Sequence, residues 1–206
     1  YYEKYKTAKT PFVGFYNFNQ QTAFITDINL VKSILITDFS NFADRATYHN
    51  RKDDPLSNHL LSVENPEWKF LRQNISPVFT SGKMKSMFHA VHTVSDRLME
   101  SFEKSVESEP NIDVKTMYGR FTSDVIGNVA FGLECNSFNG DDSFMKMGDE
   151  AFHGRKNSGI VRLLANSYPR LARALRVTVF SQVVIDFYSK IVGDAIEYRK
   201  TSNVKY

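Results

Sequence analysis

Hydrophobic residues recur at helical spacing along most of this chain. The clearest stretch follows Gly82, where apolar side chains fall three or four positions apart, at Met84, Met87, Phe88, Val91, Val94, Leu98 and Phe102. This spacing places them on one face of a helix. The same spacing predicts further helices that begin near Asp27, Trp68, Asp113, Phe144 and Ser181. The pattern therefore predicts a mainly α fold.

The pattern changes twice in the first third of the chain. Residues 12–16 and 22–25 are aromatic and β-branched runs on either side of the polar segment 17–21, which predicts a β-hairpin. From Thr37 to Glu64 the periodicity is lost and charged residues accumulate. A loop of this length inside a compact domain is usually functional or mobile. Residues 1–6 resemble the end of an exposed helix.

Local signals predict where several helices begin and end. Asp27 and Asp113 are suited to cap helix N-termini with their carboxylates. The sequence 65–67, Asn-Pro-Glu, combines a capping Asn with a Pro and an acid in the first turn of a helix. Pro77 should end that helix, and Gly132 is a suitable C-terminal stop for the helix that follows Asp113.

The composition excludes several classes of protein. The chain has 206 residues, of which 42% are hydrophobic and 24% charged, as in a globular protein and unlike a disordered or fibrous one. Its single cysteine, Cys135, excludes a disulfide scaffold and a zinc site built on several thiolates. The formal net charge of +3 is too small to indicate nucleic-acid binding, and we expect no nucleic-acid partner.

We expect a single, incomplete domain over residues 1–206. The chain has no initiator Met and no signal segment, and its last residues, 198–206, carry neither a helix cap nor a closing strand. These features indicate a piece of a longer protein. No run is long and apolar enough to span a bilayer. The surplus of 17 Phe over one Trp fits helices that enclose an apolar pocket.

Trp68 and Arg72 form the most informative pair. They lie four positions apart and therefore project from the same face of a short helix. The Arg guanidinium is a fixed fork of N–H donors suited to a carboxylate, and the indole adds one more donor. Together they could clamp an acidic group of a cofactor. The alternative is an ordinary cation–π pair, or a helix packed by its one Trp.

The pair belongs to a longer series of motifs. Trp-Lys-Phe-Leu-Arg at 68–72 is followed by Ser-Pro-Val-Phe-Thr-Ser-Gly-Lys-Met at 76–84. Further motifs stand at 11–14, 38–45, 53–60, 120–127, 130–138, 144–148 and 169–173. In their order and spacing these segments closely resemble the microsomal cytochrome P-450 monooxygenases, and within them the insect type called family six.

The resemblance implies the N-terminal part of the cytochrome P-450 fold, helices A to G with a small β-hairpin. It implies a full-length parent that oxidises apolar small molecules, such as xenobiotics, plant toxins, insecticides or endogenous lipids, with O2 and NADPH-derived electrons. The implied cofactor is haem b, and the implied partners are NADPH-cytochrome P-450 reductase and cytochrome b5. The implied location is the cytoplasmic face of the endoplasmic reticulum membrane, with an N-terminal anchor outside this sequence.

The resemblance also assigns roles to individual residues. Trp68 and Arg72 match donors to the haem propionates, and Arg45 matches a basic position that often contacts a propionate. On the residues alone, Arg45 could equally form a surface ion pair with Asp44 or Asp53. Four residues fall in regions that contact substrate in the family and are candidates to line the pocket: His59, Leu60, Leu61 and Phe152. Each could instead be plain core or surface.

Cys135 is not expected to be the axial haem ligand. The family's ligand loop reads Phe-x-x-Gly-x-x-x-Cys-x-Gly, whereas Phe131 stands only four positions before Cys135 and Ser137 replaces the last Gly. That loop, the acid–Thr pair for O2 activation and the Glu-x-x-Arg motif lie beyond Tyr206 in such proteins. We therefore expect no catalytic residue in this chain, incomplete haem binding, and no activity by itself.

Other groupings support weaker hypotheses. His89, His92 and Asp96 share a helix face without a fourth donor, so we expect no metal site there. A basic run with apolar residues interleaved could lie on an anionic membrane, as the family's F–G region does, or could be a solvated helix face. Its basic residues are Arg155, Lys156, Arg162, Arg170, Arg173 and Arg176, and its apolar residues are Leu163, Leu164, Tyr168, Leu171 and Leu175. Residues 166–176 form a basic connector around Pro169. Two alternatives to the monooxygenase remain: a non-enzymatic helical ligand-binding or membrane-surface module, and a hydrolase that uses Cys135.

Overall fold

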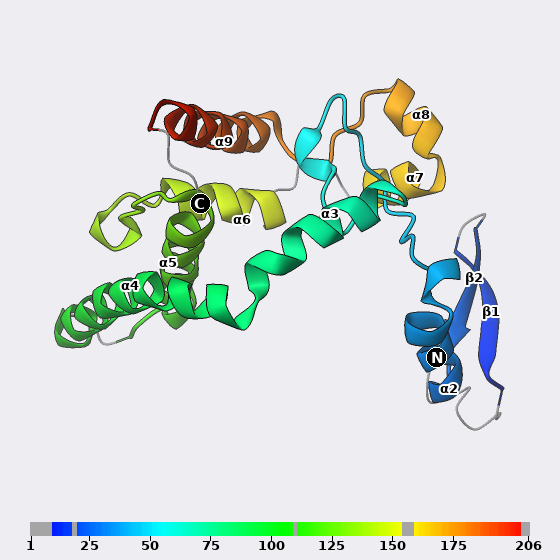
Figure 1. Cartoon of the computed structure of the whole chain (residues 1–206), viewed down its shortest axis with the longest axis horizontal. Coiled ribbons are helices and arrows are strands. Elements are labelled where there is room, and N and C mark those ends of the chain that lie inside the picture. Colours follow the sequence, from blue (N-terminus) through cyan, green and yellow to red (C-terminus); the bar gives the residue numbers. More distant parts are fainter. Residues whose placement is uncertain (1–9, 18–19, 109–110, 154–158, 203–206) are drawn as a thin grey trace. The chain divides into compact units, whose positions relative to one another are not determined.

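The computed structural model describes residues 10–17, 20–108, 111–153 and 159–202, and they fall into two compact units. The described part of the first unit is 10–17, 20–73 and 159–179, and that of the second is 74–108, 111–153 and 180–202. Helices dominate both units (Figure 1), so the expected mainly α class is confirmed. The expectation of one domain over 1–206 stays a prediction.

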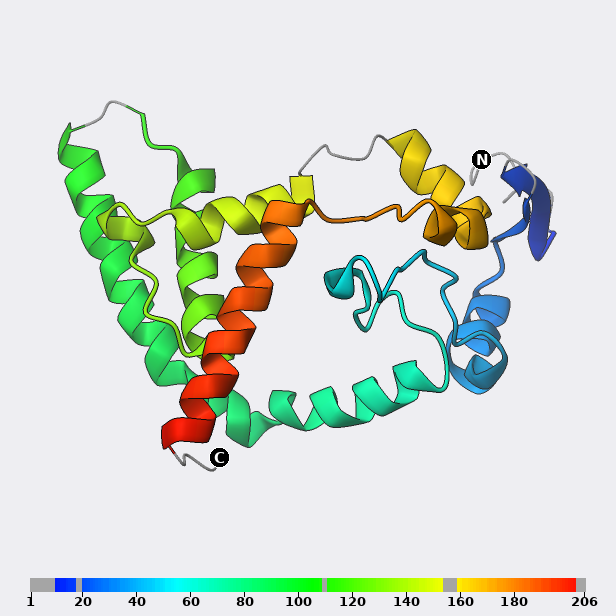
Figure 2. The ribbon, with the colours of Figure 1, turned by 90° about the horizontal axis from the view of Figure 1, so that it is seen from above.

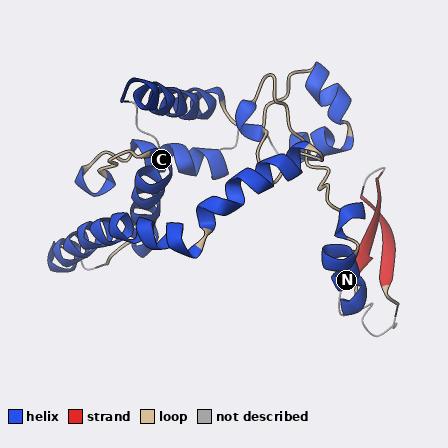
Figure 3. Cartoon of the chain, in the orientation of Figure 1, coloured by secondary structure: helices blue, strands red, loops and turns tan. Residues whose placement is uncertain are grey.

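The first unit begins with the predicted β-hairpin. Strands β1 (Phe12–Asn17) and β2 (Gln20–Ile25) pair antiparallel, with Phe12 opposite Ile25 and Asn17 opposite Gln20. They form the single sheet found in the described residues (Figure 3). The residues expected at 1–6 to end a helix lie outside the described part of the chain.

Helix α2 (Ile28–Lys32) follows the hairpin and continues into a π-helical turn, Ser33–Thr37. The Asp27 carboxylate accepts the Leu30 N–H at 2.8 Å, which confirms the predicted cap. Residues 42–66 then form the irregular loop expected from the sequence, with one 3-10 turn at Pro55–Ser57.

Helix α3 (Glu67–Ile75) ends before Pro77, as expected, and a 3-10 turn follows at Ser76–Phe79. The prediction that Asn65 caps α3 is wrong. The N–H that it would cap, that of Trp68, bonds to the Glu64 carbonyl at 2.9 Å. The Asn65 side chain instead donates through Nδ2 to the Asp44 carboxylate at 3.1 Å, a partner that is distant in sequence.

Helices α7 (Gly159–Ser167) and α8 (Pro169–Ala174) complete the helical part of the first unit. The core here consists of Tyr48, Ala165 and Ala172, with Val177 and Val179 packed against it. The sequence predicted only a connector around Pro169. Helix α8 forms there because Pro169 occupies its first turn. Proline has no N–H that would be left unpaired at this position, and its ring already holds φ near the helical value.

The second unit contains α4 (Ser81–Ser108), α5 (Val114–Ile126), α6 (Ser143–His153) and α9 (Gln182–Ser202). Helix α5 packs on α4 and on α6, and α6 packs on α9, as Figure 2 shows. Of the helix predicted from Phe144 to Leu164, the described residues form α6 up to His153 and α7 from Gly159, and α7 belongs to the other unit. Residues 154–158, between them, lie outside the described part of the chain.

Caps and aromatic contacts stabilise the second unit. Asp113 accepts the Thr116 N–H at 3.2 Å, and Gly132 ends a π-helical extension of α5 with φ of 69°, a left-handed conformation that favours glycine. Both features confirm the sequence analysis. Edge and tilted ring contacts join Phe131, Phe144, Phe187 and Tyr188 across α5, α6 and α9.

None of the described helices is apolar over a long enough stretch to cross a bilayer.

Candidate functional site

The Trp68–Arg72 pair lies on α3, as the sequence predicted. The Trp68 side chain is half-buried, and its ring centroid lies 5.6 Å from that of Phe39 with the planes tilted by 54°. Arg72 is exposed one turn further along the same face. The ring contact with Phe39 holds the indole donor of the pair in place.

The irregular loop is fastened to the N-terminal end of α3. Asp44 accepts the backbone N–H of Asn65 at 2.8 Å. Further along the loop, Asn58 Nδ2 donates to Glu67 Oε1 at 3.1 Å, and Arg51 forms an ion pair with the same oxygen at 3.4 Å. These contacts hold the start and the middle of the loop beside the N-terminal end of α3, the helix that carries the Trp–Arg pair.

Arg45 is exposed within this loop, between Asp44 and Ala46. Ala46 has φ of 51°, a left-handed conformation that costs a non-glycine residue about 1–2 kcal/mol. Among the described residues, Arg45 forms no ion pair with Asp44 or Asp53. Neither of these carboxylates therefore neutralises its guanidinium.

His59, Leu60 and Leu61 follow the 3-10 turn of the same loop. The Nδ1 atom of His59 accepts the Leu61 N–H at 3.2 Å, and partial burial lowers the pKa of the imidazole. This lowered pKa favours the neutral form of the ring at pH 7. Leu61 is 62% exposed, so this end of the loop presents an apolar side chain and a neutral imidazole.

Phe152 lies on α6 in the second unit and is 83% exposed. It borders an open groove of about 460 Å³ between α5, α6 and α9, whose apolar lining includes Ile126, Phe131, Phe144, Met145 and Tyr188. The sequence assigned Phe152 to a pocket, and the structure places it at the edge of a concave apolar surface. Its role in substrate binding stays a prediction.

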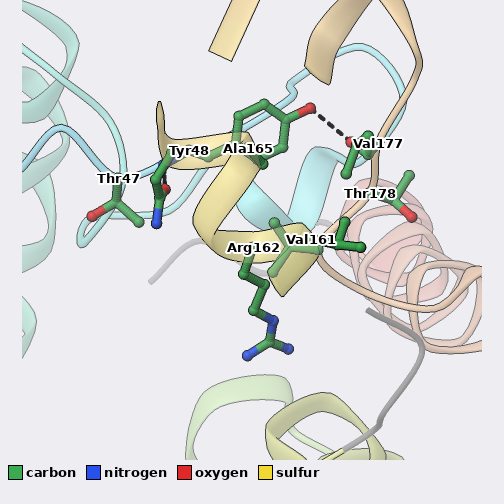
Figure 4. A pocket seen from close by; sticks show the side chains of 9 residues that line it. Thr47, Tyr48, Val161, Arg162, Ala165, Val177 and Thr178 are labelled. Carbon is green, nitrogen blue, oxygen red and sulfur yellow. Dashed lines mark hydrogen bonds between the residues drawn. The ribbon is translucent and has the colours of Figure 1, made fainter. Parts of the chain in front are cut away.

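The sequence analysis missed a buried polar cluster in the loop. Asn50, Asp54, Ser57 and Ser62 are all at least 96% buried and hydrogen-bonded. The Asp54-Pro55 pair signals a turn, because Asp before Pro favours the start of one, but it does not signal that the turn is buried. Next to this cluster, Tyr48, α7 and residues 177–179 enclose a cavity of about 170 Å³ (Figure 4).

Cys135 has the surroundings of a packed, neutral thiol. Burial, with the charges of Asp124 and Asp141, raises its pKa to about 11. The sulfur lies against the Cα of Gly127, where an added Cβ would overlap with it. A thiolate nucleophile or metal ligand requires a lowered pKa, so these surroundings do not favour the hydrolase alternative.

Asp124, beside Cys135, is 1% exposed and has an oxygen, Oδ1, without a hydrogen-bond partner among the described residues; Ser137 Oγ is in the same situation. Removal from water raises the pKa of Asp124, against the opposing effects of Ser137 and Arg97. A carboxyl whose pKa is raised on folding stabilises the fold at pH values below its unfolded pKa. That contribution is lost as the pH rises through the folded pKa.

We therefore expect Asp124→Asn to raise the thermal midpoint of the full-length protein at pH 7.5 more than at pH 5. An Asn can accept the Ser137 N–H and donate to Ser137 Oγ, which should contribute about 1 kcal/mol. Thermal unfolding at both pH values measures the difference, and the exposed Asp186→Asn on α9 is the control. A variant that is less stable than the wild type at pH 7.5 would contradict this assignment.

These features define a class of protein. A mainly helical chain with one small antiparallel sheet, in which α3 carries the paired Trp and Arg donors, has the architecture of the N-terminal part of a cytochrome P450. The family model described as Cytochrome P450 matches residues 1–200. The chain belongs to the cytochrome P450 family.

Relatives in two fly species match over the whole chain. The chain is 42% identical to cytochrome P450 6a2 of Drosophila melanogaster, over 100% of the chain and 41% of the relative. It is 38% identical to cytochrome P450 6A1 of Musca domestica, over 100% of the chain and 40% of the relative. The chain therefore spans about two fifths of the length of these curated relatives.

Proposed function

We propose that the chain is the N-terminal part of a haem-thiolate monooxygenase that oxidises apolar small molecules, including xenobiotics, plant toxins, insecticides or endogenous lipids. The observation that carries this proposal is the family match over residues 1–200, together with the Trp68–Arg72 pair that α3 presents on one face. Haem b, when bound, supplies the activation of O2, and the protein binds and orients the reactants.

The donor chemistry of the first unit fits the haem propionates, which are carboxylates. Arg72 offers a guanidinium fork on an exposed helix face, and Trp68 offers an indole N–H held by its contact with Phe39. Arg45 adds a second guanidinium that neither Asp44 nor Asp53 neutralises. We propose that these three residues bind the propionates, and that the axial Cys belongs to another part of the full-length protein.

In this proposal, His59, Leu60 and Leu61 of the loop contact the substrate. A separate proposal assigns Phe152, on α6 of the second unit, to substrate contact. The neutral imidazole and the apolar side chains suit a lipophilic ligand, because they can be covered without burying a charge. We propose that this region excludes water from the ligand and orients it. No residue of the chain is assigned to the chemical step.

We propose that helices α7 and α8 contact the membrane. Ile160, Leu164, Leu171 and Leu175 are exposed, and Arg162, Arg170 and Arg176 are exposed among them. Apolar side chains interleaved with arginines favour the interface of an anionic membrane. The proposed location is the cytoplasmic face of the endoplasmic reticulum, with NADPH-cytochrome P-450 reductase and cytochrome b5 as electron donors.

The carbon monoxide difference spectrum of the reduced protein tests the proposed function. We expect the full-length protein to show the band of a haem with a thiolate ligand, and to consume NADPH with an apolar substrate when reductase is added. The 206-residue chain supplied with haem is the matched control and should show no thiolate band. A thiolate band from this chain alone would contradict the assignment of the axial ligand, and its absence from the full-length protein would contradict the function.

A further inference from the structure

A row of hydrogen bonds joins the first half of the irregular loop to residues 166–179 of the same unit. Five side chains, two backbone carbonyls and two backbone N–H groups of these two segments take part. The bonds are Tyr48 N to Asn166 Oδ1 at 2.7 Å, Tyr48 Oη to Val177 O at 2.8 Å, Asn50 Nδ2 to Val177 O at 3.4 Å, Arg173 Nε to His49 O at 3.1 Å, and Val179 N to Asp54 Oδ2 at 2.6 Å. We call this set of contacts the loop clasp.

Asp54 is the acidic member of the loop clasp, and its exposed fraction is 0%. Its Oδ2 accepts the Val179 N–H, and its Oδ1 accepts the Ser57 N–H at 3.2 Å. A buried carboxylate is costly unless its oxygens are hydrogen-bonded, and backbone amides that donate to a charged acceptor form strong bonds. One side chain therefore holds two segments that are 125 residues apart in sequence.

Hydrogen bonds continue from Asp54 to the proposed pocket residues. Ser57 Oγ donates to the Asp54 carbonyl at 2.7 Å and accepts the Asn50 N–H at 2.9 Å. Ser62 Oγ donates to the Ser57 carbonyl and accepts the His59 N–H at 3.2 Å. The conformation of the turn that carries His59 is thus set by two serines bonded to the Asp54 turn.

Tyr48 supports the same connection from the apolar side. Its ring is 6% exposed in the core with Ala165 and Ala172. Figure 4 shows its hydroxyl directed at the Val177 carbonyl, across the cavity lined by α7 and residues 177–179. The core therefore fixes the same segment, Val177 to Val179, to which Asp54 is bonded.

We infer that Asp54 is a positioning residue that determines ligand specificity: through the loop clasp it fixes the conformation of residues 55–61, and with it the placement of His59, Leu60 and Leu61 against the ligand. Asp54 does not contact the ligand itself. The inference rests on the proposed function, which assigns those three residues to the pocket.

The test is Asp54→Asn in the full-length protein. Asparagine has one acceptor oxygen in place of two, so either the Val179 N–H or the Ser57 N–H meets an NH2 group. We expect amide hydrogen exchange in peptides covering 55–63 and 177–180 to become at least about tenfold faster. Exchange in α4 and α9 should be unchanged, which separates a local effect from general destabilisation.

Ligand binding is the second readout, with two azoles that coordinate haem iron. We expect the Kd of 4-phenylimidazole, whose phenyl group reaches into the pocket, to rise about tenfold in Asp54→Asn. The Kd of imidazole should stay within about twofold of the wild type, because imidazole is too small to contact the loop. A merely structural defect would weaken both azoles together.

Two further variants make the test decisive. Asp53→Asn is the matched control: it removes the same charge at the preceding position, where the carboxylate accepts from Asn50 Nδ2 and not from Val179. Asparagine keeps an acceptor oxygen for Asn50, so both readouts should stay near wild type. Tyr48→Phe removes the hydroxyl that donates to Val177 O and interacts with Asn50, and it should change both readouts in the same direction by about threefold. It replaces Asp54→Asn if that variant does not fold.

The proposal is wrong if Asp54→Asn, or Tyr48→Phe in its place, leaves the selectivity between the two azoles unchanged. It is also wrong if exchange rises equally in all helices. Failure of the proposed function would be seen separately, as a wild-type protein without a thiolate band. The exchange experiment would then still test the loop clasp, because it does not require haem.

Discussion

Replacing Arg72 with alanine in the full-length protein is expected to lower its haem content strongly. Arg72 is the exposed cationic member of the pair on α3, and we propose that it binds a haem propionate. A charge-assisted hydrogen bond contributes about 1.5–3 kcal/mol, so haem should bind roughly 10- to 150-fold more weakly. Haem content per polypeptide, with the rate of haem transfer to an apo-acceptor protein, measures the effect.

Two variants of the same helix serve as controls. Lys69→Ala removes an exposed positive charge from a different face of α3 and should leave haem content unchanged. Arg72→Lys keeps the charge but loses the planar fork, so it should give an intermediate value. Haem retention in Arg72→Ala equal to that of the wild type would overturn the propionate assignment.

Gly127→Ala is expected to destabilise the second unit by about 1–3 kcal/mol, the usual cost of an overpacked core. A Cβ at Gly127 would overlap with the Cys135 sulfur. The same Cβ would lie 3.6 Å from the Cβ of Cys135, which is ordinary contact. Adding Cys135→Ala should therefore restore most of the lost stability, as measured by thermal unfolding of the full-length protein.

Gly193→Ala on α9 is the matched control, because a Cβ there meets no atom within 4 Å. It should be neutral or stabilising by up to about 1 kcal/mol, since alanine is the better helix former. If the double variant were no more stable than Gly127→Ala alone, the steric account of Cys135 would be incorrect. A haem thiolate spectrum that persists in Cys135→Ala would also agree with a structural role for this thiol.

The sequence alone predicted the features that depend on neighbours along the chain. The caps at Asp27 and Asp113 and the stop at Gly132 were predicted correctly, because each depends on residues two to four positions away. The hairpin and the stripe of α4 were predicted from hydrophobic spacing for the same reason. The family motifs, whose order and spacing are also properties of the sequence, gave the family that the comparisons then confirmed.

Where local signals competed with distant partners, prediction from sequence failed. Asn65 had every property of a helix cap, yet its side chain bonds to Asp44, 21 residues earlier. The stretch after Phe144 had the spacing of one helix, yet α6 and α7 belong to different units. Hydrophobic spacing reports that a face is buried, but not which element buries it.

The candidate site divides in the same way. Trp68 and Arg72 could be paired from sequence, because four residues of helix place them on one face. The contact of Asp54 with Val179 could not be predicted from sequence, because a carboxylate before a proline in a charged loop has the pattern of a solvated turn. Only the tertiary structure brings Val179 to it across 125 residues. The sequence determined the helices and the donors they carry. The fold decided which polar groups of the loop are buried, because burial depends on partners that are distant along the chain.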